Sequence, residues 1–147
     1  MIGHELREFV DRVMDRRAID DEDIRILQRE ILHDAVLNRE VLDVLIALDR
    51  AVAAKSPLFA DLLVALTVDF AVWESRPTGL IDRDKAHWLV TTLSAGDGPT
   101  LTAQKIGFEI VREAQACDEA LISFALRKGD ARTRGVVFEP QRMLLAS

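Results

Sequence analysis

What this sequence lacks removes several classes of protein from consideration. It has a single cysteine, Cys117, so it can form neither an internal disulfide nor a CxxC zinc or redox motif. Its 25 acidic residues outnumber its 19 lysines and arginines, and the net charge of −6 argues against the basic face that nucleic-acid binding requires. We therefore expect a protein of a reducing compartment, the cytoplasm, that has no nucleic-acid partner.

The chain also has no apolar segment that is free of charge and long enough to suggest a membrane span. Its most apolar stretch, residues 56–73, contains Asp61 and Asp69. Each of these carboxylates would cost about 2.5–3.5 kcal/mol at the centre of a bilayer. The first residues are charged and amphipathic and do not resemble a secretory signal. We expect no membrane insertion.

Signatures of catalysis are missing as well. The sequence contains no GxSxG nucleophile motif, glycine-rich phosphate loop, Walker motif or catalytic-triad spacing. It therefore favours a binding protein over an enzyme, and it implies no cofactor.

What the sequence does have is apolar residues at helical spacing along almost its whole length, with no strand alternation before the C-terminal tail. Polar residues stand where helices would start, and a polar side chain there can accept hydrogen bonds from free backbone N–H groups. The predicted caps are Asp20, Asn38, Ser56, Asp82, Thr100 or Thr102, and Asp118. We predict an all-α single domain of six to seven helices, and the pattern leaves open whether the sixth and seventh are continuous.

The helix predicted over residues 57–74 differs from the others because it is apolar nearly all round. Such a helix is typical of the centre of a fold, where every side is covered. We expect it to be the buried core of the domain, with Leu66 and Phe70 among the core residues.

Two carboxylates interrupt this helix. Asp61 and Asp69 are eight residues apart and so lie near one face. Buried carboxylates are unfavourable unless they are paired. We expect them to form an exposed edge or to pair with an arginine such as Arg76 or Arg112. A functional acidic pocket, which would make the protein an enzyme, is the alternative.

An internal repeat organises the chain. Residues 18–32 align with residues 80–94, so that Asp20 falls on Asp82 and Leu27 on Leu89, 62 positions later. Downstream, "LNREVL" corresponds to "LTAQKI" if a two-residue insertion is allowed. We predict a doubled three-helix unit, with halves of about residues 1–54 and 55–129, followed by a tail at 130–147.

This layout resembles the TerB-like family, which comprises tellurite-resistance proteins and the N-terminal domain of DjlA-type J-proteins. The resemblance rests on "PTGLIDRDKAHWL" and "SAGDGPTLTAQKI", which are similar to the family's paired ADG-x-I-x-x-x-E turns, and it covers roughly residues 57–115. Thr78 stands where the family has aspartate, Lys85 stands near the usual glutamate, and Asp97-Gly98 matches. The resemblance implies an all-helical domain and a bacterial stress-response or envelope-associated role.

The segment around Asp97 has the look of a calcium loop between two helices. With Gly98 at the sixth position of an EF-hand, however, Asp97 would be the only carboxylate ligand. We interpret Asp97-Gly98 as a tight turn ahead of a helix cap, and Asp97 remains a candidate binding residue only.

A divalent metal is the second possibility that the sequence raises. Asp82, Asp84 and His87 fall within about one turn of a single helix and could converge on an ion. The acidic run at residues 20–23 is another candidate, although consecutive carboxylates on a helix point in different directions.

The C-terminal tail differs in charge from the rest of the chain. Residues 127–147 hold five basic and two acidic residues, which is a net charge of +3 and leaves −9 on the remainder. The tail also carries the apolar residues Val136, Val137, Phe138, Met143, Leu144 and Leu145. We predict that it docks on its own chain or across a homodimer.

Taken together, these features favour a non-enzymatic binding or scaffold module of the TerB-like kind, with a protein partner or a second copy as its ligand. The alternatives are a divalent-metal-responsive protein that uses acidic helix N-termini, and an enzyme with a carboxylate site on residues 57–74.

Overall fold

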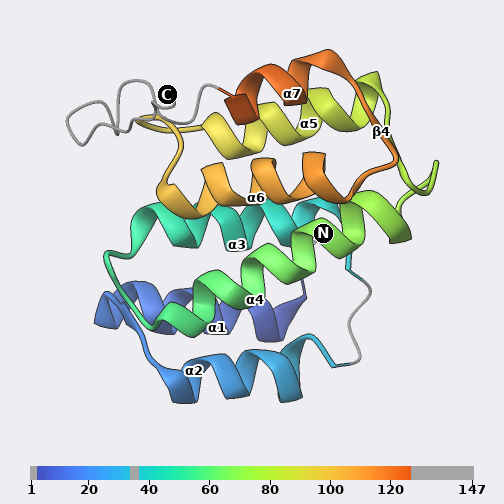
Figure 1. Ribbon diagram of the computed structural model, residues 1–147. Helices are drawn as coiled ribbons and strands as arrows, with labels where there is room; N and C mark the ends of the chain where they lie inside the picture. The colour runs from blue at the N-terminus through green and yellow to red at the C-terminus, as the bar shows by residue number, and fades with distance from the viewer. Residues whose placement is uncertain (1–2, 34–36, 127–147) are drawn as a thin grey trace.

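The computed structural model describes residues 3–33 and 37–126, in which seven helices follow one another with short strands between them (Figure 1). The elements are α1 (His4–Arg16), β1 (Ala18–Ile19), α2 (Asp21–Ile26) with a π-helical end η1 (Leu27–Ile31), α3 (Arg39–Ala51), β2 (Ala54–Lys55), α4 (Pro57–Val68) with a π-helical end η2 (Asp69–Glu74), β3 (Leu80–Ile81), α5 (Arg83–Ser94), α6 (Leu101–Glu113), β4 (Ala116–Cys117) and α7 (Glu119–Leu126). The all-α prediction is confirmed. Four strands of two residues each also occur among the described residues, and they are too short to show the alternation of a longer strand. The predicted tail lies outside the described residues.

Most helices begin at the polar residues predicted to cap them. The side chains of Asp20, Asn38, Ser56, Asp82 and Thr100 each accept a hydrogen bond from a backbone N–H in the first turn of their helix. Thr100, not Thr102, therefore caps α6, and the Asp118 carboxylate accepts from the N–H of Ala120 at the start of α7. Each cap stabilises its helix by about 1 kcal/mol.

Helices α6 and α7 are separate, which settles the point that the sequence left open. Between them β4 runs parallel to β3, with Leu80 opposite Ala116 and Ile81 opposite Cys117. The N–H of Gln115 donates to the Gly79 carbonyl and the N–H of Asp118 to the Ile81 carbonyl. The chain leaves the helix here because these N–H groups bond to a distant segment instead of to the preceding turn.

The two short sheets confirm that the fold is doubled. Ala18 pairs with Ala54 in the first sheet, and Leu80 pairs with Ala116 in the second, so both partners shift by the same 62 residues. The caps Asn38 and Thr100 keep this spacing too. The predicted two-residue insertion is therefore wrong. Helix α4 ends the first unit, and its continuation η2 leads into the second.

Equivalent buried positions in the two units carry side chains of opposite charge. In the first unit Asp23 is 4% exposed, and its carboxylate lies 2.5 Å from Nη2 of Arg16. In the second unit the equivalent residue is Lys85, which is 1% exposed. Its Nζ donates to the backbone carbonyls of Ala71, Ser75, Pro77 and Leu80, at 2.7, 2.8, 2.7 and 2.9 Å. Each unit thus supplies its own partner for a buried charge.

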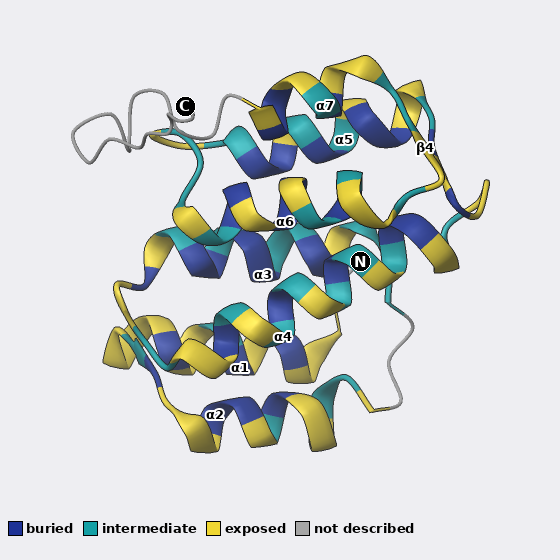
Figure 2. Cartoon of the chain, in the orientation of Figure 1, coloured by how far each residue is buried: buried dark blue, intermediate teal, exposed yellow. Residues whose placement is uncertain are grey.

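Helix α4 is buried on one side only, which corrects the prediction of a helix covered all round. Phe59, Leu63 and Thr67 face the interior, where α4 packs against α2, α3 and α6. Leu66 and Phe70, predicted as core residues, are only half-buried. Figure 2 shows exposed and half-buried residues along the outer side of this helix. The central helix therefore leaves part of its apolar surface uncovered.

Gly107 sets the close approach of α6 to α7. A Cβ at this position would lie 2.7 and 2.8 Å from two carbons of the buried Phe124 ring. We predict that Gly107→Ala lowers the free energy of unfolding by about 1–3 kcal/mol, because the clash outweighs the gain in helix propensity. Urea denaturation measures this. The double variant with Phe124→Leu should recover part of the loss, and a stabilised Gly107→Ala protein would contradict the packing described here.

Candidate functional site

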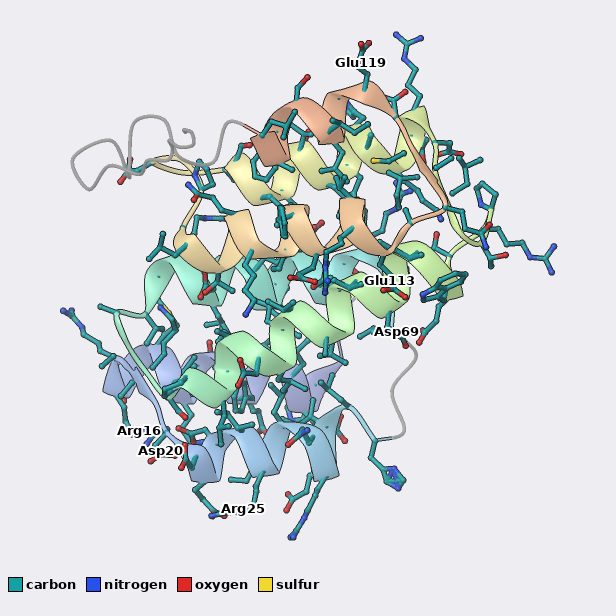
Figure 3. The ribbon with its side chains drawn as sticks, viewed as in Figure 1. Arg16, Asp20, Arg25, Asp69, Glu113 and Glu119 are labelled. Atoms are coloured by element: carbon teal, nitrogen blue, oxygen red, sulfur yellow. The ribbon has the colours of Figure 1, made fainter. Side chains whose placement is uncertain are left out.

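A groove lies where the uncovered side of α4 and η2 meets α6. It has a volume of about 430 Å³ and combines an apolar floor with charged walls. Its lining residues are Val64, Ala65, Val68, Asp69, Trp73, Lys105, Glu109 and Glu113. Figure 3 shows Asp69 on η2 and Glu113 on α6, on neighbouring elements. Uncovered apolar surface and clustered carboxylates coincide in this groove.

The Trp73 indole is held at one end of this groove. Its Nε1–H donates to Oε2 of Glu113 at 3.2 Å, and the side chain is 40% exposed. The hydrogen bond satisfies the polar end of the ring and leaves part of its apolar surface open to solvent. A tryptophan placed in this way offers a partner a large contact surface without first having to be ordered.

Asp69 and Glu74 form a carboxylate pair next to the tryptophan. They are the first and last residues of η2, where the N–H of Ser75 bonds to the carbonyl of Phe70 in the five-residue step of a π-helix. The hydrogen bond with Asp69 raises the pKa of Glu74, and burial and the charge of Asp69 raise it further. When both carboxylates are ionised, the pair places two negative charges at this end of the groove.

Basic residues offset only part of this charge. Arg112 pairs with Glu109 at 2.9 Å on the solvent side, and Lys105 belongs to the groove wall. Four carboxylates (Asp69, Glu74, Glu109 and Glu113) thus face two cations, which leaves the groove and its margin at about −2. An excess of one sign beside apolar surface steers segments of the opposite sign toward it.

The Asp69–Glu74 pair makes stability depend on pH. Because the folded-state pKa of Glu74 lies above its ordinary value of 4.5, the folded protein holds more protons than the unfolded chain just above that value. Stability should therefore fall as the pH rises through this window. We predict that Glu74→Gln removes this decline and makes the protein more stable at neutral pH, by less than about 1 kcal/mol because the pair is exposed.

Urea denaturation of both proteins from about pH 4 to pH 8 measures this effect. Glu5→Gln, on the exposed side of α1, is the matched control, and it should leave the pH profile unchanged. A Glu74→Gln protein that is less stable than the parent at neutral pH would show that the carboxylate pair stabilises the fold.

The structure separates the two carboxylates that the sequence placed together on residues 57–74. Asp69 lines the groove, whereas Asp61 is exposed on α4 outside it. Arg112, one of the predicted partners, pairs with Glu109 instead. Both side chains are exposed, as the exposed-edge alternative predicts, and Asp69 also lines the groove.

Asp97 lies in the turn between α5 and α6, away from the groove lining. Its neighbours Gly96 and Gly98 have φ values of 73° and 107°, a conformation that residues with a side chain rarely adopt. The interpretation of Asp97-Gly98 as a tight turn is therefore confirmed.

Of the three residues proposed to bind a metal, the two carboxylates are engaged with other groups. The Asp82 carboxylate accepts from the N–H of Lys85, Asp84 lies 2.8 Å from Arg39, and His87 is exposed. In the first unit, Asp20 and Asp23 form a capping box beside Arg16. Figure 3 shows Asp20 next to Arg16. Within residues 3–33 and 37–126, no group of three or more His, Cys, Asp or Glu side chains is arranged to hold a metal ion.

Sequence reasoning missed the α6 side of the groove. Lys105, Glu109 and Glu113 recur every four residues, which places them on one face of a helix. Val64 and Val68 have the same spacing on α4. These two stripes were visible in the sequence, but nothing local indicated that they would face each other.

No protein-family model, curated protein or solved structure matches this chain. Of the helices that the structure describes, none has the length and apolar character needed to cross a membrane.

Proposed function

We propose that this protein is a non-enzymatic interaction module that binds, in the groove between α4, η2 and α6, a protein segment carrying basic and large apolar side chains. The groove itself is the observation that carries the proposal, because it joins uncovered apolar surface to a net negative margin. The doubled helical unit, with its 62-residue repeat, supports a role like that of TerB-like bacterial stress-response proteins.

The groove suits such a segment in two ways. Val64, Val68 and the open part of Trp73 provide apolar contacts, which supply most of the affinity in small interfaces. The carboxylates of Asp69 and Glu113 provide charge complementarity, which speeds association and selects the partner. A basic segment without apolar side chains would make only the charge contacts with this groove. An apolar segment without charge would make only the apolar contacts.

Selection of peptides against the full-length protein tests the proposal. Displayed random peptides of about 16 residues should be enriched in arginine or lysine and in large apolar residues. The selected peptides should bind Glu113→Lys at least ten times more weakly than the parent, and increasing salt should weaken their binding.

The matched control is Glu119→Lys, which makes the same charge change at an exposed position on α7, outside the groove (Figure 3). Peptides that bind Glu119→Lys normally but bind Glu113→Lys poorly locate the site in the groove. Selected peptides without basic residues, or equal binding to both variants, would contradict the proposal.

A further inference from the structure

The chain itself contains a segment with the chemistry that the groove selects. Residues 127–147 have a net charge of +3, with Arg132, Arg134 and Arg142 among their basic residues. Their apolar residues fall in two groups, around Phe138 and at residues 143–145. A segment with this pattern can place arginines against the acidic margin and large side chains on the apolar floor at the same time.

The end of the described chain puts this segment within reach of the groove. Helix α7 ends at Leu126 and packs against α6, whose other residues form one wall of the groove. The 13 residues of α6 are about 20 Å long. Residues 127–131, which precede Arg132, could span about 17 Å if extended, and residues 127–141, which precede Arg142, about 50 Å. The segment as a whole is therefore long enough to reach the groove without displacing α7.

We infer that residues 130–147 of the same chain occupy the groove between α4, η2 and α6 in the free protein. This inference rests on the proposed function, since it assigns an occupant to the same surface. The arginines lie against Asp69 and Glu113, and the apolar residues lie on Val68 and Trp73. An external partner then has to displace a tethered competitor whose effective concentration is on the order of millimolar.

A spin label at the end of the full-length chain tests where the segment lies. The label is attached to the cysteine of a Ser147→Cys variant in which Cys117 is replaced by serine. The native Cys117 thiol would in any case react slowly with the label, because burial raises its pKa to about 11. The amide resonances of Lys105, Glu109 and Glu113 should broaden, and those of α1 should not. Broadening on another face, or none, would overturn the inference.

A mixed sample distinguishes docking of the segment within one chain from docking onto a second copy of the protein. Spin-labelled protein without isotope label is mixed with isotope-labelled protein that carries no spin label. Docking within one chain predicts no broadening in the mixture. Broadening of the α6 amides there would show that the segment crosses to a partner molecule and would overturn docking in cis.

The indole N–H resonance of Trp73 gives an independent readout. The variant Arg132→Glu, Arg134→Glu, Phe138→Ser should shift this resonance, and it should bind the selected basic peptides at least ten times more tightly than the parent. If the peptides shift the Trp73 signal but the variant neither shifts it nor binds more tightly, the inference fails and the proposed function stands. If peptides and variant both leave the signal unchanged, both fail.

Discussion

Replacing Lys85 by methionine should lower the free energy of unfolding by about 3–5 kcal/mol. Lys85 is 1% exposed, and its ammonium group lies within hydrogen-bond distance of four backbone carbonyls, which belong to η2, to the loop that follows it and to the first residue of β3. Burial lowers the pKa of Lys85, and the charge of Asp82 opposes this effect. Methionine fills a similar volume but removes the ammonium donor, and each buried carbonyl left unsatisfied costs about 1–3 kcal/mol. The Pro77 carbonyl keeps the N–H of Leu80 as a donor.

Urea denaturation at neutral pH measures this loss. Lys105→Met is the matched control, because Lys105 is exposed on α6 and its replacement should change stability by no more than about 0.5 kcal/mol. If the two variants had equal stability, Lys85 would not be the residue that holds the loop between η2 and β3.

Replacing Phe59 by alanine should cost about 3–5 kcal/mol, whereas Leu66→Ala should cost less than about 2 kcal/mol. Phe59 is 1% exposed on the inner side of α4, and removing its ring leaves a cavity that the surrounding helices cannot fully close. Leu66 is half-buried, so its removal takes away less contact and opens less enclosed space.

The same denaturation series, with circular dichroism to confirm a helical native state, compares the two variants directly. The difference between them tests whether Leu66, two turns after Phe59 on a similar side of α4, is less enclosed than Phe59. Equal losses of stability would contradict the half-buried position of Leu66.

Local chemistry explains why the helices could be predicted. Asn38, Ser56 and Asp82 accept hydrogen bonds within the first turn of their own helices, so their role depends on only a few neighbouring residues. The apolar spacing between the caps defines the inner face of each helix in the same local way. These interactions need no knowledge of the rest of the fold.

The parallel strand pairs could not be predicted on these grounds. Ala116 and Cys117 pair in register with Leu80 and Ile81, which lie 36 residues earlier in the chain. Strands of two residues are too short to show alternation. The separation of α6 from α7 therefore depends on a long-range contact that leaves no local signal.

Helix α4 shows the limit of periodicity itself. A helix that is apolar all round has no preferred face, so the pattern cannot indicate which side the fold leaves open. Lys85 presents a similar difficulty, because its partners are backbone carbonyls of residues 71–80, and backbone carbonyls carry no sequence signature. Both features had to be seen in three dimensions, and one of them forms the floor of the candidate site.

Site-specific photocrosslinking in cells tests most directly whether the groove is a docking surface. A photoreactive amino acid replaces Val68 in the groove or, as a control, Met14, which is 43% exposed on α1. The account predicts that Val68 crosslinks to defined segments containing arginine or lysine beside large apolar residues, residues 130–147 of the same chain among them. It predicts no such products from Met14. If Val68 gave no crosslinks, or gave crosslinks that match those from Met14 in yield and composition, the groove would not be a docking surface.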